Sequence, residues 1–200
     1  MDIVELAVPD AYRITPTRRP DERGVFHETM RARELAAATG RRFPVAQANH
    51  SVSRRGVLRG LHGVAVPPGQ AKYVSCLRGA VLDIVVDVRV GSPAYGTCAV
   101  NRLDAGSAVA VFVAEGLAHG FVALTDGATV GYLCSTAYED TEPYELNPLD
   151  PDLALPWGCA DPILSAKDRA APTLAEAAAA GLLPTFRQCR DLYAAADALA

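Results

Sequence analysis

One short stretch of the sequence, residues 56–72, concentrates side chains that can do chemistry. Arg59 and His62 lie three residues apart in an apolar run, and Lys72 opens the next strand-like run after a Pro-Pro-Gly turn. A fixed cation, a titratable base and an ammonium therefore sit on two consecutive segments joined by a rigid turn. A histidine has suitable basicity to remove a proton near neutral pH. We expect the chemistry of the protein in this stretch.

The spacing of Arg59 and His62 poses a geometric problem. Side chains alternate between the two faces of a regular strand, so residues three apart point in opposite directions. Both side chains are needed in one pocket if they are to act together. Gly60 is the residue best able to supply an irregularity, and the sequence therefore predicts a bulge or kink there.

The elements that must position these residues are mostly strands. Apolar runs bounded by turn residues recur at roughly ten-residue spacing, which is typical of an all-β sandwich or barrel and not of alternating βα units. The predicted strands are 11–15, 45–53, 80–90, 97–103, 108–114, 119–124 and 128–135. In 80–90 the residues of one parity are all apolar, whereas the other parity mixes Val with Asp and Arg, which predicts one buried and one partly buried face.

Helices are predicted only outside the strand-rich region. Residues 31–39 favour a short helix stopped by Gly40, after a polar loop at 16–22. Thr173 followed by Glu176 forms a capping box, and Gly181 is the expected stop of that helix. A last helix is expected from about 187 to the end, and Leu192, Tyr193, Ala196 and Leu199 share one of its faces.

Composition limits the possible classes of protein. The 200 residues are half hydrophobic, which suits one domain, with a β core at about 11–137 and a loop and helical tail at about 138–200. The net charge of -4 comes without a basic stripe, so we expect no nucleic-acid partner. No apolar stretch has membrane-spanning length, so no membrane partner is expected. The five cysteines form no CxxC pair and read as reduced thiols in a cytoplasmic protein.

The histidines do not favour a metal centre. There are four, and none lies in an HxH pair, whereas metal sites of β-barrel enzymes usually combine several histidines with a carboxylate at close spacing. His62 and His119 could still meet across a barrel. On its own, a lone histidine in a strand is more often a packed, hydrogen-bonded residue of the core.

Several motifs follow one another in a fixed order. They are Arg59-Gly60-Leu61-His62, Gln70-Ala71-Lys72, Ala118-His119-Gly120-Phe121, Tyr132 within 131–135, and Asp150-Pro151. Further pieces are Arg23-Gly24 with Phe26 and Glu28, Gln47 with Asn49-His50-Ser51, residues 87–92, and residues 164–168. Over about residues 10–175 this order resembles the dTDP-4-dehydrorhamnose 3,5-epimerase family.

The resemblance implies a fold, a substrate and an assembly. The expected fold is all-β, a double-stranded β-helix (cupin-type jelly roll) with short C-terminal helices. The expected substrate is a dTDP-4-keto-6-deoxyhexose, transformed without metal or other cofactor by a protein that is usually a homodimer. The tail from Thr173 to Pro184 is similar to that of family members from actinomycete deoxysugar pathways, in which single epimerisation at C3 or C5 also occurs.

The resemblance also implies roles for individual residues. His62 matches the catalytic base, Asp168 the carboxylate that orients it, Tyr132 the acid on the opposite face, and Lys72 the group near the C4 oxygen. Arg59 and Arg23 match phosphate and substrate contacts. The residues expected to line or support the pocket are Phe26, Glu28, Gln47, Asn49, His119 and Tyr138.

The chemistry explains these residue types. A carbon next to a ketone loses its proton only if the developing enolate is stabilised, which Lys72 can do. A carboxylate such as Asp168 fixes the tautomer of the base, and inversion needs a second proton donor across the ring. Each residue also has a structural reading: Tyr132 as a strand-face aromatic, Lys72 as a solvated strand end, and Asp168 as a turn residue.

The sequence departs from the family pattern at several positions. Gly63 and Val64 stand where the family commonly has Tyr-Gln, Ala48 stands where Asp is common, and Met30 replaces the usual aromatic residue. Gly63 removes bulk beside the base, which leaves the sugar and the number of inverted centres open. Three other functions also stay open: a ketoisomerase on the same fold, a metal-dependent cupin oxygenase, and a non-catalytic sugar-binding module.

Overall fold

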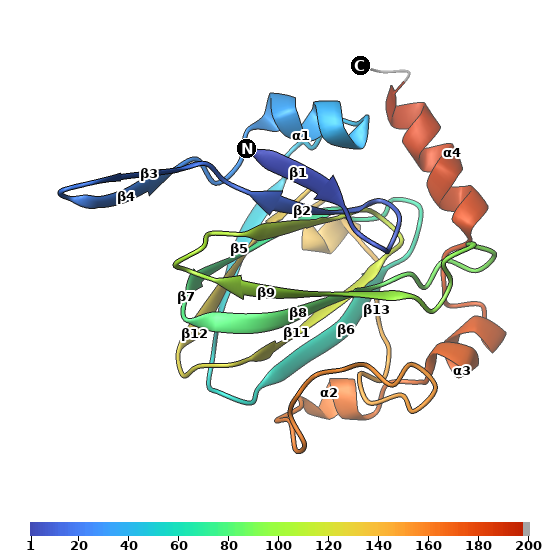
Figure 1. Cartoon of the computed structure of the whole chain (residues 1–200). Helices are drawn as coiled ribbons and strands as arrows, with labels where there is room; N and C mark the ends of the chain where they lie inside the picture. Colours follow the sequence, from blue (N-terminus) through green and yellow to red (C-terminus); the bar gives the residue numbers. More distant parts are fainter. Residues whose placement is uncertain (198–200) are drawn as a thin grey trace.

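The computed structural model describes residues 1–197, and most of its strands form two facing antiparallel sheets (Figure 1). The first sheet has the order β1 (Asp2–Glu5), β2 (Ala11–Thr15), β10 (Ala110–Val113), β7 (Lys72–Arg78), β12 (Ala128–Cys134) and β5 (Gln47–Ser53). The second has the order β13 (Pro143–Glu145), β6 (Leu58–Val64), β11 (Ala118–Ala123), β8 (Ala80–Val86) and β9 (Cys98–Asp104). Except for the pairs β1–β2 and β8–β9, neighbouring strands come from distant parts of the chain, as in the predicted jelly roll.

The core has two parts, one between the sheets and one under the C-terminal tail. Val74, Val111 and Phe121 belong to the part between the sheets. On the outer face of the second sheet, Leu61 and Ile84 pack with tail residues such as Trp157, Leu174 and Leu183. The second sheet is therefore covered on both faces, which is why its strands read as nearly continuous apolar runs.

The prediction of an only partly buried face in the strand at 80–90 is wrong. Strand β8 ends at Val86, and the mixed parity, which includes Asp83, Asp87 and Arg89, is fully buried. Its charges are paired: Asp83 with His119, and Asp87 with Arg89. A buried charge is tolerated when a partner of opposite charge or a hydrogen bond compensates it, and such a face still looks half-polar in the sequence.

The helices begin and end close to the predicted positions. Helix α1 (Ala32–Thr39) ends at Gly40, whose φ is 73°. Helix α3 (Leu174–Ala179) has the predicted capping box between Thr173 and Glu176, and short helices η1 (Tyr138–Asp140) and α2 (Ala166–Arg169) precede it. In helix α4 (Phe186–Asp197), Leu192 and Tyr193 of the predicted face both pack on the core, whereas Leu199 and the side chain of Ala196 lie outside the described part.

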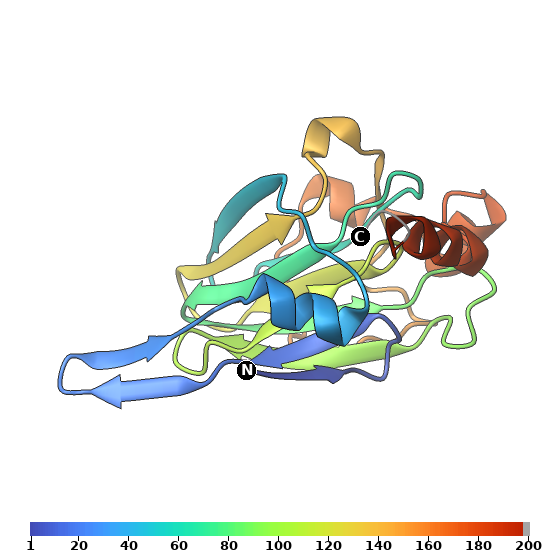
Figure 2. The ribbon, with the colours of Figure 1, turned by 90° about the horizontal axis from the view of Figure 1, so that it is seen from above.

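The predicted loop at 16–22 is instead part of a β-hairpin, β3 (Arg18–Asp21) and β4 (Gly24–His27). The hairpin pairs only with itself and projects away from the sheets (Figures 1 and 2). All four residues of β3 are exposed. Its sequence has no alternation of apolar and polar residues because neither face packs on the core, so the periodicity that predicts strands is missing. The short strands β1 and β13 were also not predicted and extend the β region beyond 11–137.

The predicted irregularity at Gly60 is confirmed. Gly60 has a φ of 124°, and the pairing of β6 with β11 shifts register between His119 and Phe121. A Cβ at Gly60 would lie 2.6 Å from the Cα of Gly120, so a side chain would push the two strands apart. The irregularity turns Arg59 and His62 toward the same hollow.

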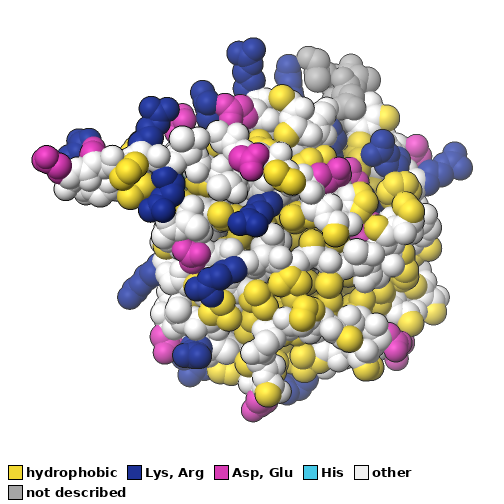
Figure 3. Space-filling model, viewed as in Figure 1, with side chains coloured by type: hydrophobic (Ala, Val, Ile, Leu, Met, Phe, Trp, Pro, Cys, Tyr) yellow, Lys and Arg dark blue, Asp and Glu magenta, His cyan; other side chains and the backbone are white. Residues whose placement is uncertain are grey.

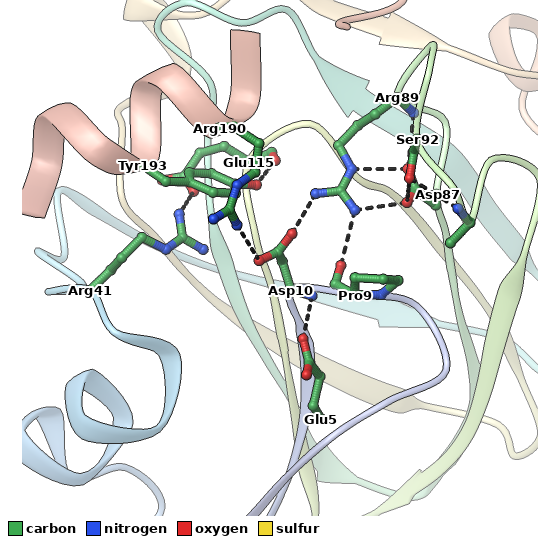
Figure 4. A network of polar contacts seen from close by, with 11 residues as sticks. Glu5, Pro9, Asp10, Arg41, Asp87, Arg89, Ser92, Glu115, Arg190 and Tyr193 are labelled. Carbon is green, nitrogen blue, oxygen red and sulfur yellow. Dashed lines mark hydrogen bonds and ion pairs between the residues drawn. The ribbon is translucent and has the colours of Figure 1, made fainter. Parts of the chain in front are cut away.

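A network of charged groups fastens α4 to the end of the barrel (Figure 4). The guanidinium of the fully buried Arg89 donates to Asp87 at 2.9 and 2.7 Å and to Asp10 at 2.6 Å. Tyr193 of α4 donates to the backbone oxygen of Glu115 at 2.6 Å, and the guanidinium of Arg41 stacks 3.7 Å above its ring. These five side chains, together with Glu115, are called the clasp below.

The surface and the thiols give two further observations. On the face shown in Figure 3, basic and acidic side chains are interspersed and no continuous basic stripe forms. Between residues 1 and 197, no helix has the length and apolar character needed to cross a membrane. All five cysteines are free thiols. The cytoplasmic location inferred from reduced cysteines stays a prediction.

Candidate active site

Two adjoining hollows of about 300 and 290 Å³ open where the two sheets meet at the ends of β6 and β7. They share the lining residues Arg59, His62, Gln70, Lys72 and Tyr138. Glu145, Ser165, Lys167 and Asp168 line the first hollow in addition, and Asn49, Ser51, His119, Tyr132 and Cys134 line the second. Most of the residues predicted from the motifs therefore meet at one place.

The predicted base and its carboxylate are in contact. His62 on β6 forms a hydrogen bond of 2.7 Å from Nε2 to Oδ1 of Asp168. Asp168 lies in α2, whose N-cap residue Ser165 donates to Oδ2 at 2.8 Å and accepts from the Asp168 backbone N–H at 3.0 Å. The carboxylate is thus fixed by a helix N-terminus, so the turn expected at Asp168 is a short helix with a defined cap.

The environment keeps His62 neutral. Burial lowers the pKa of His62 below its ordinary value of 6.5, and the hydrogen bond with Asp168 opposes that effect without cancelling it. Because Nε2 faces a carboxylate, it carries the proton, and Nδ1 is the nitrogen that can accept one. The arrangement is that of a neutral base whose tautomer is set by a buried acid.

Lys72 opens β7 at the wall that the two hollows share. Burial lowers the pKa of its ammonium. No residue between 1 and 197 forms a hydrogen bond or ion pair with its Nζ, and Cys134 lies opposite it on β12. A desolvated ammonium without a protein acceptor is well suited to bind an oxygen of a ligand that gains negative charge.

Tyr132 enters the second hollow from β12. Its phenol oxygen lies 3.3 Å from Oγ of Ser51 on β5. Burial raises the pKa of Tyr132 to about 12, against the lowering effects of the Ser51 hydrogen bond and the Arg59 charge. The phenol is therefore protonated at neutral pH and can donate a proton.

His119 forms a second histidine–carboxylate pair deeper in the barrel. Its Nε2 lies 2.5 Å from Oδ2 of Asp83, and both side chains are buried. The ring of His119 meets that of Tyr132 edge to face, with centroids 6.5 Å apart. His62 and His119 are register partners on β6 and β11, yet each is hydrogen-bonded to its own carboxylate.

Within residues 1–197 no group of three His, Cys, Asp or Glu side chains could hold a metal ion. The absence of a cofactor stays a prediction.

Of the remaining predicted residues, Arg59, Asn49 and Tyr138 line the hollows, whereas Gln47 lies outside the lining and is hydrogen-bonded to it. Arg59 donates from Nε to Oγ of Ser53 at 3.1 Å, so its guanidinium is tied to β5. Asn49 lines the second hollow and accepts a hydrogen bond of 2.9 Å from Gln47. Gln47 in turn accepts from the backbone N–H of Tyr138 at 2.7 Å.

Three predicted substrate contacts lie elsewhere. Arg23, Phe26 and Glu28 belong to the β3–β4 hairpin or follow it, and none lines either hollow. The Arg23 side chain is 89% exposed and pairs with Asp21, and Phe26 is 63% exposed. A single chain does not bring these residues to His62.

Some lining residues were not predicted. Glu145 pairs in register with His62 on the short strand β13 and forms an ion pair with Lys167. Lys167 and Ser165 are neighbours of Asp168 in the motif at 164–168, so the sequence did carry a signal for them. Ser51 likewise stands in the motif Asn49-His50-Ser51. Glu145 carried no such signal, because its position depends on the pairing of β13 with β6.

Gly63 does not leave empty space beside the base, which corrects the interpretation drawn from the sequence. Gly63 and Tyr144 are register partners on β6 and β13. A Cβ at Gly63 would lie 2.2 Å from Cζ of Tyr144, so the tyrosine ring fills the place of the missing side chain. The departure from the family pattern at Gly63 is therefore accommodated by packing.

Comparison with known proteins identifies the family of the chain. The family model for dTDP-4-dehydrorhamnose 3,5-epimerase matches residues 5–176. A dTDP-4-dehydrorhamnose 3-epimerase of Streptomyces niveus is 50% identical over 190 residues, 95% of this chain and 92% of the relative. A dTDP-4-dehydrorhamnose 3,5-epimerase of Mycolicibacterium smegmatis is 47% identical over 186 residues, 93% of this chain and 92% of the relative.

A solved structure of a related enzyme has the same fold as this chain. The crystal structure of ChmJ, a 3'-monoepimerase from Streptomyces bikiniensis in complex with dTDP-quinovose, superimposes with a TM-score of 0.93 at 45% identity. The superposition covers 96% of this chain and 98% of ChmJ, and with it the predicted cupin-type jelly roll is confirmed. The chain belongs to the dTDP-4-dehydrorhamnose 3,5-epimerase family, an enzyme family of isomerases, as its motifs predicted.

Proposed function

We propose that this protein is an epimerase that inverts C3, C5 or both of a dTDP-4-keto-6-deoxyhexose. The observation that carries the proposal is the placement of two proton-transfer groups around one hollow. The neutral base His62, oriented by Asp168, and the protonated phenol of Tyr132 both face the space that Lys72 and Arg59 also line.

The first step is removal of a proton from the carbon beside the ketone. Nδ1 of His62 takes the proton, and the electron pair of the C–H bond moves into the C4 carbonyl to form an enolate. Asp168 stabilises the imidazolium that results. The Lys72 ammonium binds the C4 oxygen, where the negative charge develops, and thereby lowers the barrier.

The second step is reprotonation from the other side. The phenol of Tyr132 donates its proton to the same carbon on the opposite face, and the enolate returns to a ketone. The sugar has then lost one proton and gained one, and only the configuration of the carbon has changed. Proton transfer from imidazolium to phenolate through solvent restores both side chains.

We expect C3 to be inverted whether the protein inverts one carbon or two. The relatives described above are named as 3-epimerases or 3,5-epimerases, so C3 is common to them. Whether C5 is also inverted is the question that the labelling experiment below answers.

Arg59 is suited to bind the diphosphate of a dTDP group, because its planar guanidinium can make bidentate contact with phosphate oxygens.

The test is incubation of the protein with dTDP-4-keto-6-deoxyglucose in deuterium oxide, with the label located by NMR. An epimerase introduces deuterium at C3, C5 or both and yields a product of inverted configuration there. A ketoisomerase would move the carbonyl to another carbon, and a binding module would introduce no label. His62→Asn keeps the size and a hydrogen bond but cannot accept the proton, so its activity should fall by about 10²- to 10⁴-fold.

We also propose that the active form is a homodimer in which the β3–β4 hairpin of each chain reaches the site of the other. The hairpin projects from the barrel and carries the exposed residues Arg23 and Phe26, which the motifs assign to the substrate (Figures 1 and 2). Val52 and Leu77 are also exposed, on the first sheet. A second copy would cover these apolar side chains and bring the hairpin residues to a hollow.

A mixed-dimer experiment tests this assembly. His62→Asn and Arg23→Ala chains are each expected to be nearly inactive alone. In a heterodimer, one of the two sites combines an intact His62 with the intact Arg23 of the other chain, so mixing after dissociation should restore a fraction of the activity. A monomer in sedimentation velocity, or no recovery in verified heterodimers, would contradict the proposal.

A further inference from the structure

The inner face of β5 carries two serines, each of which contacts a different functional group. Ser51 lies 3.3 Å from the phenol oxygen of Tyr132, which comes from β12. Ser53, two residues further on the same face, accepts a hydrogen bond of 3.1 Å from Nε of Arg59, which comes from β6. Strand β5 therefore contacts both the phenol of Tyr132, which is suited to proton donation, and the guanidinium of Arg59, which is suited to phosphate binding.

The sheet register fixes the first of these contacts. Ser51 pairs with Val130 and Asn49 pairs with Tyr132, so Ser51 and Tyr132 are diagonal neighbours on adjacent antiparallel strands. Diagonal neighbours on one face lie within reach of a long side chain. Ser51 itself lines the second hollow, beside Tyr132 and His62.

The direction of the Ser51 hydrogen bond follows from the chemistry. If Tyr132 hands its proton to the sugar, its O–H must point toward the substrate. The hydroxyl of Ser51 must then be the donor, and the phenol oxygen the acceptor. A donor held at that oxygen becomes a stronger partner when the phenol turns into a phenolate, because hydrogen bonds to charged groups are stronger.

The need for such a donor is set by burial. Tyr132 is mostly enclosed, which raises its pKa to about 12 and makes the phenolate unfavourable. The Ser51 hydrogen bond and the positive charge of Arg59 both act in the opposite direction. Ser53 keeps that charge in place through its contact with Arg59.

We propose that Ser51 is a positioning residue for proton donation, which aims the Tyr132 phenol at the substrate carbon and donates a hydrogen bond to the phenolate as it forms. Ser53 has the corresponding role for Arg59 and so serves the dTDP group. This inference rests on the proposed epimerase function. It assigns the two hydroxyls to different steps, since one serves reprotonation and the other serves binding.

Ser51→Ala and Ser53→Ala are matched variants that each remove one hydroxyl from the same face of the same strand. Ser51→Ala should slow epimerisation by about 10- to 100-fold, the effect of losing a hydrogen bond to a charged group. It should slow deuterium uptake at the same carbon much less and leave dTDP affinity unchanged. Ser53→Ala should weaken dTDP binding and leave the ratio of inversion to deuterium uptake as in the wild type.

A double-mutant cycle with Tyr132→Phe separates positioning from a general effect on the strand. If Ser51 acts through the phenol, Ser51→Ala should slow epimerisation no further in the Tyr132→Phe background. Circular dichroism confirms that each variant is folded. Additive losses in the cycle, or inversion at the wild-type rate in Ser51→Ala, would overturn the inference. A wild-type protein that neither labels nor inverts the sugar would instead overturn the proposed function.

Discussion

The imidazole of His62 works as a base only while it is neutral, and its surroundings act on that state in two opposite ways. Burial destabilises the imidazolium, and the carboxylate of Asp168 stabilises it. The pKa of His62 is lowered as a net result, so the base stays available below the usual titration range of histidine. Asp168 meanwhile serves a second purpose, since it fixes which nitrogen carries the proton.

The pH dependence of kcat/KM tests this balance. The rate should be constant above the pKa of His62 and fall below it, with the midpoint under 6.5 in the free enzyme. Asp168→Asn removes the charge that stabilises the imidazolium, so the pKa falls further and the acid limb moves to lower pH. The plateau should fall as well, because the tautomer is no longer fixed. A shift of the acid limb to higher pH would contradict the assignment.

Arg59 and Lys72 line the same hollows but are expected to do different work. Arg59 sits at the outer wall, tied to Ser53, whereas Lys72 is a desolvated ammonium without a protein acceptor among residues 1–197. Arg59→Ala should weaken dTDP binding strongly, and Lys72→Ala should lower kcat more than dTDP affinity. Calorimetric titration with dTDP and steady-state kinetics separate the two effects. Equal losses of dTDP affinity would show that both cations bind the nucleotide.

At the scale of elements, the strand β6 depends on one glycine. Gly60 has a φ of 124° and approaches the backbone of β11, where a Cβ would lie 2.6 Å from Gly120. Gly24 in the hairpin has a similar φ of 131°, but nothing lies within 4 Å of the position of its Cβ. The two positions therefore separate backbone conformation from close packing.

Alanine at each of these positions gives the corresponding prediction. Both variants meet the strain of a positive φ, but only Gly60→Ala must also push two strands apart. Gly60→Ala should lower the free energy of unfolding by about 2 kcal/mol more than Gly24→Ala, the size of a typical overpacking effect. Urea unfolding followed by circular dichroism measures both. An equal loss of unfolding free energy in the two variants would mean that β11 moves aside for the Cβ at residue 60 without loss of stability.

The sequence predicts those elements whose signal is local. Strands such as 11–15 and 128–135 alternate or end at turn residues, and the capping box at Thr173 is a pattern of four residues. The hairpin at 18–27 has no such signal, because within one chain all its strand residues except the half-buried His27 are exposed. The periodicity of apolar residues arises because one face of a segment is buried against the core of its own chain. A strand that faces only solvent or another chain therefore lacks this periodicity and is not predicted from it.

The site divides in the same way. His62, Lys72 and Asp168 stand in recognisable motifs, and the spacing of Arg59 and His62 was enough to predict the irregularity at Gly60. Contacts between distant strands could not be predicted. Ser51 and Tyr132 are 81 residues apart, and the space at Gly63 is filled by a ring from another strand. Such contacts follow from register, which the sequence of a single strand does not contain.

At the scale of the whole molecule, the clasp lies between the C-terminal helix, the β1–β2 turn and the end of β8, and Arg190 of α4 forms an ion pair of 3.9 Å with Asp10 of that turn (Figure 4). It also touches the surroundings of the site. Glu115 binds Arg41, and its side chain packs against Gly69, the residue before Gln70 in the wall of both hollows. A continuous set of contacts therefore links the tail helix to the wall of the site.

Arg89 is the member of the clasp whose loss should cost most. Its guanidinium is fully buried between Asp87 and Asp10, so Arg89→Met leaves the buried carboxylate of Asp87 without its cation. Removing one partner of a buried ion pair is expected to lower the free energy of unfolding by about 3–5 kcal/mol. Arg187→Met is the matched control, since Arg187 pairs with Asp191 on the surface of α4 and is 92% exposed, and it should unfold like the wild type. Chemical denaturation of both variants measures the difference. If Arg89→Met is as stable as Arg187→Met, the hydrophobic packing of α4 alone holds the tail, and the clasp contributes specificity without stability.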